Sequence, residues 1–174
     1  MIFFKKSKEL HPLKTLGIMK EHPSFKVESL SFKHNDRIPT QYTCDGPDVS
    51  PHLKWDNPSV PVEEQALIMY DPDAPIGIFY HWLLYNMKPD LRELPENVPK
   101  EASTAYGVQG INDFGRIGYG GPCPPPGRPH RYVFLILGLD RKLELPAGLR
   151  PRQLLSAVKD HIVAYGAIVG LYGR

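Results

Sequence analysis

Short apolar runs, separated by proline and glycine, are spread along most of this 174-residue chain. Runs that alternate apolar and polar residues, or that stay apolar between two turns, are typical of β-strands. The pattern predicts strands at residues 25–32, 38–44, 50–55, 65–70, 79–87, 130–139 and 167–172. Residues 65–70 and 130–139 are apolar at most positions, so we expect these two strands to be buried on both faces.

One stretch near the end of the chain follows a helical period instead. The positions that share this period are Leu154, Val158, Ile162 and Tyr165. Pro151 suits a first helical turn and Gly166 suits a helix end, so we predict one helix over residues 151–166. Because helices do not alternate with strands, a parallel sheet is not expected. The predicted fold class is mainly β, an antiparallel β-sandwich.

Composition narrows the class of protein further. Hydrophobic residues make up 41% of the chain and the net charge is +2, which suits one globular domain and gives no sign of a nucleic-acid surface. The 19 prolines and 15 glycines lie between the apolar runs, where turns are expected. No apolar run approaches the roughly 18 to 20 residues that a transmembrane helix needs.

The first part of the chain is rich in lysine and lacks the apolar core of a secretory signal. We predict a poorly ordered arm at residues 1–24, a single domain at residues 25–174, and a cytoplasmic location. Met19 is an alternative start of translation. In a chain without a secretory signal, Cys44 and Cys123 are expected to be free thiols. A bridge between them stays open, because both lie in irregular segments.

Side chains suited to a small ligand gather at the start of the strand at residues 130–139. In a strand, His130 and Tyr132 share one face while Arg131 points to the other. The glycine- and proline-rich residues 120–129 come directly before them. We therefore expect an imidazole and a phenol side by side beneath a rigid loop, as in a small-ligand pocket.

Two other strands bring polar groups that bear on this pocket. Asp71 and Asp73 follow the strand at residues 65–70, and Asp71 is expected to accept a hydrogen bond from a histidine. Arg131 is expected to pair with an acid such as Asp73 or Asp140. These contacts would hold the turn after the strand at residues 65–70 in one conformation.

Two more histidines lie in predicted strands. By strict alternation, His81 shares a face with Leu83 and Tyr85, where an imidazole needs a hydrogen bond or a cavity. His52 alternates with Leu53 and is expected on a solvated face.

The motifs leave few kinds of chemistry. No G-x-S-x-G elbow is present, and Cys123 is the one candidate nucleophile. Metal-ligand atoms are carried by Asp71, Asp73, His81 and His130, but their spacing matches no closed zinc motif, and no P-loop follows a strand. We expect no metal and no cofactor. An anion pocket remains, in which the amides of Gly120 and Gly121 would donate beside the imidazoles and the phenol.

Several stretches together resemble one protein family. DPDAP from Asp71, YHWLLYN from Tyr80 and GPCPPPGRPHRYVF from Gly121 closely resemble motifs of the phosphatidylethanolamine-binding protein family, which includes the Raf kinase inhibitor proteins. IPTQYTCDGPDVSPHLKW and NDFGRIGYGGPCPPPG resemble its bacterial and archaeal branch. The resemblance covers residues 25–174.

The resemblance implies a β-sandwich with a Greek-key element and a small anion pocket. By motif, the ligand-binding residues would be Asp71, Pro75, His81, Gly121, Pro122, Pro124, His130 and Tyr132. It also implies a cis peptide bond before Pro75. Members of the family bind phosphate, phosphorylethanolamine or similar anions, and act by binding proteins such as kinases and serine proteases rather than by catalysis. The chain departs from the animal members because no helix follows its last predicted strand.

Two rival functions belong to other classes. A serine-protease inhibitor would use an exposed loop, for which residues 88–103 are the candidate. A hydrolase would use the histidine and aspartate pocket or Cys123, and would turn over an ester or phosphoester. The exposed edges of a sandwich would also allow a homodimer.

Overall fold

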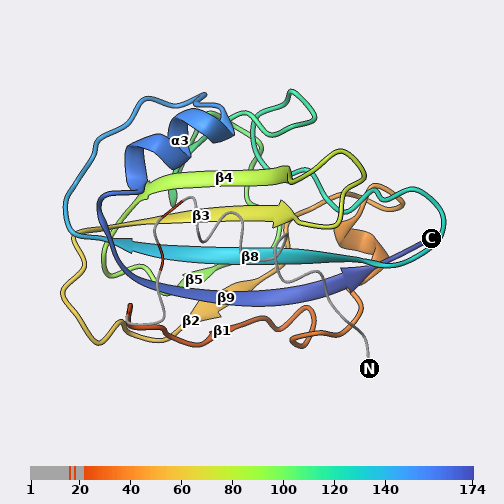
Figure 1. The fold of residues 1–174 in the computed structure, drawn as a ribbon, viewed down its shortest axis with the longest axis horizontal. Coiled ribbons are helices and arrows are strands. Elements are labelled where there is room, and N and C mark those ends of the chain that lie inside the picture. The colour runs from red at the N-terminus through yellow and green to blue at the C-terminus, as the bar shows by residue number, and fades with distance from the viewer. Residues whose placement is uncertain (1–15, 17, 19–21) are drawn as a thin grey trace.

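The computed structural model describes residues 16, 18 and 22–174 (Figure 1). Within them lie nine strands, one 3₁₀ helix and one α-helix. The strands are β1 (Val27–Glu28), β2 (Leu53–Trp55), β3 (Glu64–Asp71), β4 (Phe79–Met87), β5 (Glu93–Leu94), β6 (Ser103–Thr104), β7 (Gly107–Gln109), β8 (His130–Leu139) and β9 (Ile162–Tyr172). The helices are η1 (Thr40–Tyr42) and α3 (Pro151–Val158).

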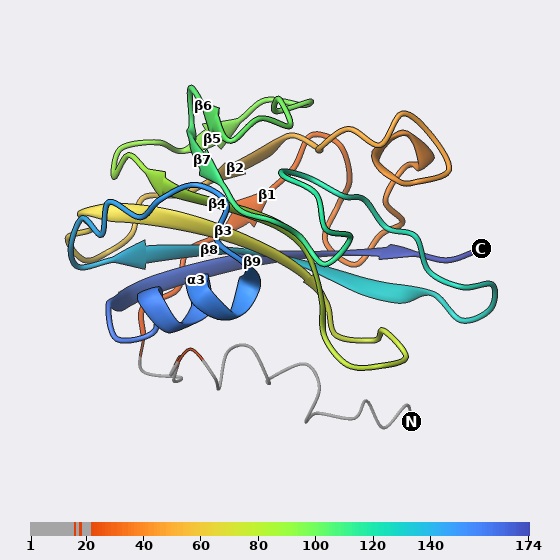
Figure 2. The ribbon, with the colours of Figure 1, turned by 90° about the horizontal axis from the view of Figure 1, so that it is seen from above.

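The strands form two antiparallel sheets. The larger has the order β6-β7-β4-β3-β8-β9, and the smaller has the order β1-β2-β5. Figure 2 shows the small sheet on one side of the large sheet and α3 on the other. The predicted class, mainly β and antiparallel, is confirmed; the β-sandwich and its Greek-key element stay predictions.

Both faces of the large sheet are buried, which explains why its central strands are so apolar. On β8, Phe134 and Ile136 point into a core cluster shared with the small sheet, whereas Leu135 and Leu137 point into a second cluster with α3. This alternation carries over from β8 to β3, its neighbour in the sheet. The candidate site described below lies where the large sheet's face toward the small sheet reaches its end.

Two predicted elements have other conformations. Residues 38–44 contain η1 and not a strand. The helix predicted over residues 151–166 ends at Val158, and β9 begins at Ile162, which pairs with Leu139. Buried and less buried residues alternate along β9, which is the two-residue period of a strand. The spacing of Leu154, Val158, Ile162 and Tyr165 also fits a helix, so the sequence alone extends the predicted helix too far.

Residues 88–103, predicted as a surface loop, contain β5 and are fastened to the core. Trp55 donates from its indole Nε1 to Gln65 Oε1 at 2.9 Å. The Gln65 amide then donates to the carbonyls of Lys88 and Leu91 at 2.7 and 2.9 Å. A buried glutamine thus joins the core to the start of the segment.

A second tryptophan and glutamine repeat this arrangement at the end of the segment. Trp82 donates to Gln109 Oε1 at 2.7 Å, and both side chains are fully buried. The Gln109 amide donates to the carbonyls of Pro99 and Glu101 at 2.7 and 2.8 Å. Both ends of the segment are therefore hydrogen-bonded to buried amides.

Most of the predicted N-terminal arm, at residues 1–15, 17 and 19–21, lies outside the described residues. Leu16 is 1% exposed and belongs to the core cluster beneath α3. Pro23 accepts a hydrogen bond from the amide of Tyr165 on β9. None of the described helices has the length and apolar character that crossing a membrane requires.

Candidate functional site

The site begins where β3 ends and β8 starts, at neighbouring positions in the large sheet. His130 Nδ1 lies 2.7 Å from Asp71 Oδ2, and both side chains are buried. The other carboxylate oxygen, Oδ1, accepts the amide of Asp73 at 2.7 Å. Asp71 is thereby held on both sides and fixes the orientation of the His130 ring, as expected. Burial raises the pKa of Asp71, and the bond to His130 opposes this rise.

Tyr132 lies between two imidazoles on the same face. Its ring stacks on His130 with centroids 6.4 Å apart and meets His81 edge-on at 5.3 Å. The hydroxyl is buried and, among the described residues, has no hydrogen bond of ordinary geometry. Burial, and then the negative charge of Asp71, raise the pKa of this phenol well above its usual range. The phenol therefore stays protonated and can donate.

His81 reaches this face through a β-bulge, which strict alternation does not predict. The pairing of β3 with β4 shifts between Met69, opposite Trp82, and Tyr70, opposite Tyr80, so that His81 is the extra residue. The prediction that His81 shares a face with Leu83 and Tyr85 is wrong, because the bulge turns its side chain toward Tyr132. Bulges commonly re-aim side chains in this way beside functional sites.

The His81 ring is held as a neutral imidazole. Its Nδ1 lies 2.7 Å from the carbonyl oxygen of Gly120, which can only accept, so Nδ1 carries the proton. Burial lowers the pKa of His81 to about 4. Hydrogen bonds to the backbone of Gly120 and Gly121 and the charge of Asp48 work against this decrease in pKa, whereas the charge of His130 adds to the decrease. Above that pH, Nε2 holds a lone pair for a ligand.

The buried neutral His81 predicts a dependence of stability on pH. Between pH 6.5 and about 4, the unfolded chain takes up a proton at His81 that the folded chain does not. The free energy of unfolding should therefore fall by up to about 3 kcal/mol as the pH drops through this window. Urea denaturation at several pH values measures this, and His81→Gln should flatten the profile.

The comparison with His81→Gln isolates the histidine. Asp71, whose pKa burial raises, contributes in the opposite sense, because its folded form holds a proton to higher pH than its unfolded form. An unchanged profile in the His81→Gln variant would contradict a depressed pKa at His81.

The turn that follows Asp71 is hydrogen-bonded to Arg131, the second residue of β8. Arg131 donates to Asp73 from Nε at 2.9 Å and from Nη2 at 2.8 Å, and its backbone amide adds a third bond at 2.9 Å. Burial works against ionisation of Asp73, but the bonds from Arg131 outweigh it and lower the pKa of that carboxyl. The predicted pairing of Arg131 with Asp73 is confirmed.

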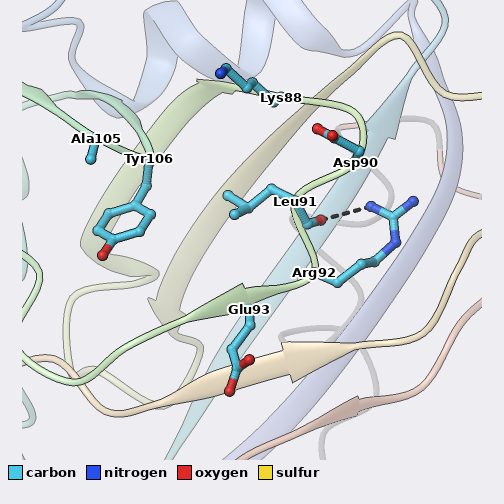
Figure 3. A pocket seen from close by; sticks show the side chains of 7 residues that line it. All are labelled: Lys88, Asp90, Leu91, Arg92, Glu93, Ala105 and Tyr106. Atoms are coloured by element: carbon cyan, nitrogen blue, oxygen red, sulfur yellow. Dashed lines mark hydrogen bonds between the residues drawn. The ribbon is translucent and has the colours of Figure 1, made fainter.

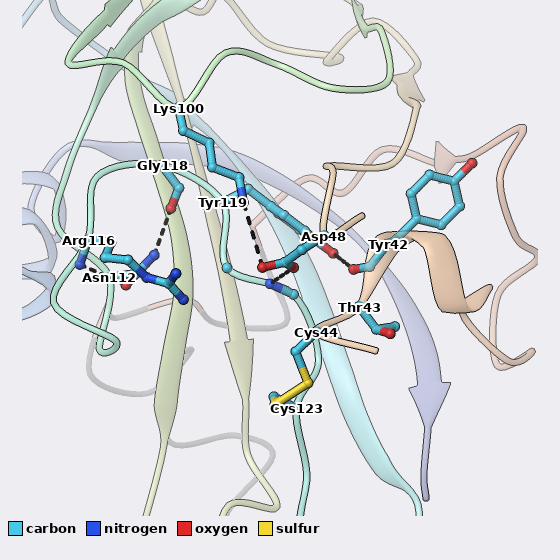
Figure 4. A network of polar contacts seen from close by, with 12 residues as sticks. Tyr42, Thr43, Cys44, Asp48, Lys100, Asn112, Arg116, Gly118, Tyr119 and Cys123 are labelled. Atoms are coloured by element: carbon cyan, nitrogen blue, oxygen red, sulfur yellow. Dashed lines mark hydrogen bonds and ion pairs between the residues drawn. A yellow bond between two sulfur atoms is a disulfide. The ribbon is translucent and has the colours of Figure 1, made fainter. Parts of the chain in front are cut away.

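The glycine amides predicted to bind an anion have partners inside the protein. Gly120 donates to the carbonyl of His81 at 2.9 Å, and Gly121 donates to Asp48 Oδ1 at 2.7 Å. Asp48 also lies 3.6 Å from Lys100 Nζ (Figure 4). A Cβ at Gly121 would stand 2.3 Å from the carbonyl oxygen of Tyr42, so this close approach requires glycine. Both amides are therefore engaged in bonds that hold the loop in its conformation.

The predicted proline residues are placed in two different ways. Pro122 and Pro124 are buried in the loop before β8, and the Pro122 carbonyl accepts the amide of Cys44 at 3.1 Å. Pro75 is exposed in the turn between β3 and β4. No peptide bond of the described residues is cis, so the expected cis bond before Pro75 is wrong; the turn closes with the lower-energy trans form.

The expectation of free thiols is also wrong. Cys44 and Cys123 form a disulfide, with their Cα atoms 5.4 Å apart. That separation is ordinary for a bridge and arises because the η1 segment packs against the loop before β8. Cys123 consequently offers no free thiol as a nucleophile.

Several residues around the site were missed or misplaced from the sequence. Phe79 and Phe114 pack against His81, with ring centroids 4.9 and 5.3 Å away, and form an aromatic border. His52, predicted on a solvated face, is 7% exposed and bonds to Glu93 at 2.6 Å. Among the described residues, no three histidine, cysteine or acidic side chains are grouped as a metal would require.

Comparison with known proteins identifies relatives of this chain. Residues 28–173 match the family model of the phosphatidylethanolamine-binding protein. A UPF0098 protein of Aquifex aeolicus is 47% identical over 150 residues, covering 85% of this chain and 88% of that protein. One from Pyrococcus horikoshii is 44% identical over 163 residues, covering 91% and 81%.

Two solved structures share the fold. The crystal structure of a putative phosphatidylethanolamine-binding protein homologue from Chlamydia trachomatis has a TM-score of 0.77 at 34% identity, covering 87% of this chain and 99% of that one. Escherichia coli YbcL, described as a new member of the mammalian family, has a TM-score of 0.79 at 29% identity, covering 86% and 98%. The chain therefore belongs to the phosphatidylethanolamine-binding protein family.

Proposed function

We propose that this protein binds a small phosphate-type anion, either free or as a phosphorylated head group, among Asp71, His81, His130 and Tyr132, and that it acts by binding and not by catalysis. The observation that carries the proposal is the Tyr132 hydroxyl, which is buried beside two imidazoles and has no hydrogen bond of ordinary geometry among the described residues. A buried polar group without a partner costs about 1–3 kcal/mol. A ligand oxygen would remove that cost.

The state of each side chain indicates which ligand form is preferred. Tyr132 donates, and neutral His81 accepts through Nε2, so a phosphate that keeps one proton satisfies both. His130 lies beside them, with its ring oriented by Asp71. A phosphomonoester gains this proton at about pH 6, so affinity for phosphorylethanolamine should rise as the pH falls from 7.5 to 5.5.

Calorimetric titration with inorganic phosphate and with phosphorylethanolamine, at pH 5.5 and 7.5, tests the proposal. We expect weak binding, with phosphorylethanolamine bound more tightly at pH 5.5, and His130→Ala should reduce affinity about tenfold or more because it removes a hydrogen bond to a charged group. Equal affinity of the two ligands would indicate that the phosphate group alone is recognised.

His161→Ala is a matched control for this titration. His161 pairs with Asp140 at 2.9 Å as His130 pairs with Asp71, but at the other end of β8. Its loss should leave affinity unchanged. Failure of the wild type to bind either ligand at both pH values would refute the proposal.

A protein partner would meet a different surface. A hollow of about 290 Å³ lies between residues 88–93 and Tyr106 (Figure 3), and another of about 500 Å³ lies beside the 79% exposed Leu30. We propose that this surface contacts a protein such as a protease or kinase. Inhibition of such an enzyme should then survive His130→Ala, whereas loss of inhibition in that variant would assign the contact to the pocket.

A further inference from the structure

The disulfide joins Cys44, which follows η1, to Cys123 in the loop before β8 (Figure 4). Its two halves differ in accessibility, since Cys123 is exposed and Cys44 is partly buried. Thiolates cleave disulfides by attacking a sulfur atom that they can reach. Cys123 is therefore the half of the bond that is more open to attack.

A cation lies against both sulfur atoms. Arg174 Nη2 is 2.9 Å from Cys44 Sγ and 3.2 Å from Cys123 Sγ. Asp45 holds the guanidinium in place, through Nε at 3.1 Å and Nη2 at 3.0 Å. A neighbouring arginine stabilises a thiolate, and a more stable thiolate is a better leaving group in exchange.

We propose that this disulfide is a thiol-exchange site for a small thiol of the glutathione class. The thiolate attacks Cys123 Sγ, and the S–S electron pair passes to Cys44 Sγ, which leaves as a thiolate paired with Arg174. This step gives a mixed disulfide on Cys123. A second thiolate attacks the outer sulfur of that bond, which releases the disulfide of the small thiol and Cys123 as a thiolate. The two thiols supply the two electrons, and solvent supplies protons to the products.

Other contacts keep the two segments together after cleavage, so the exchange is reversible in the folded protein. The Cys44 amide still donates to the Pro122 carbonyl at 3.1 Å. The Gly121 amide still donates to Asp48, and the Tyr119 hydroxyl donates to the Tyr42 carbonyl at 2.6 Å. The cysteines can therefore remain close enough to reform the bond.

The test incubates the oxidised full-length chain with reduced glutathione under native conditions. Samples are quenched in acid and alkylated, and the modified residues are found by mass spectrometry of peptides. We expect glutathione on Cys123 and the alkyl group on Cys44. Arg174→Gln should slow cleavage about tenfold, since the leaving thiolate loses its cation. Arg174→Lys should restore part of the rate.

Arg128→Gln is the matched control, because it removes one positive charge from the same loop and has no bond to either sulfur among the described contacts. Its cleavage rate should equal that of the wild type. Thermal unfolding of each oxidised variant verifies that it is folded. Glutathione mainly on Cys44, equal rates in the Arg174 and Arg128 variants, or cleavage only in guanidinium chloride would each overturn the proposal.

Discussion

Replacing both Cys44 and Cys123 by serine should lower the free energy of unfolding by about 4 kcal/mol. The two cysteines are 79 residues apart in sequence, so their bond removes much of the freedom of the unfolded chain. Few of the described contacts depend on the bond itself, and the effect should therefore appear mainly through the unfolded state. Urea denaturation of the oxidised wild type and of the double variant measures the difference.

The wild type provides the control for this experiment. After complete reduction, its unfolding midpoint should fall to that of the double serine variant. If the double variant and the oxidised wild type unfold at the same urea concentration, the bond does not stabilise the fold.

Gln109→Leu should lower the free energy of unfolding by about 3–5 kcal/mol. The substitution leaves the Trp82 indole N–H without its acceptor and the carbonyls of Pro99 and Glu101 without their donor. The unpaired indole N–H is buried and costs about 1–3 kcal/mol, and each bond lost at the two carbonyls, which belong to exposed residues, costs about 0.5–1.5 kcal/mol. Denaturant titration followed by circular dichroism gives the value directly.

A glutamine at the surface separates this effect from loss of the amide as such. Gln41 is exposed, so Gln41→Leu should change stability by less than about 0.5 kcal/mol. Gln65→Leu, which breaks the parallel arrangement at Trp55, should match Gln109→Leu in size. Similar stabilities for Gln109→Leu and Gln41→Leu would mean that the buried amide is not needed.

The long strands could be predicted because long apolar runs between turn residues are typical of buried strands. Residues 79–87 and 130–139 are apolar runs bounded by turns, and they match β4 and β8 in the structure. The contact of His130 with Tyr132 and the pairing of Arg131 with Asp73 follow from alternation on one strand and from a neighbouring polar corner.

The remaining features depend on contacts between distant segments. Alternation has no means of showing the bulge at His81, because an inserted residue leaves the residue types unchanged. The cellular compartment favours free thiols but carries no information on the disulfide, which depends on the approach of Cys44 to Cys123 in the fold. The Gly121 amide was assigned to a ligand because Asp48, 73 residues earlier, could not be placed beside it.

The positions of the two tryptophans have a spectroscopic consequence. Both indoles are buried in the core between the sheets and bonded to glutamine, so intrinsic fluorescence will follow the unfolding of that core. Trp82 adjoins His81 in the bulge and meets Tyr119 edge-on at 5.4 Å, whereas Trp55 lies in the small sheet. A Trp55→Phe protein would therefore carry a single emitting indole next to the pocket, and its spectrum could report ligand binding without an added label.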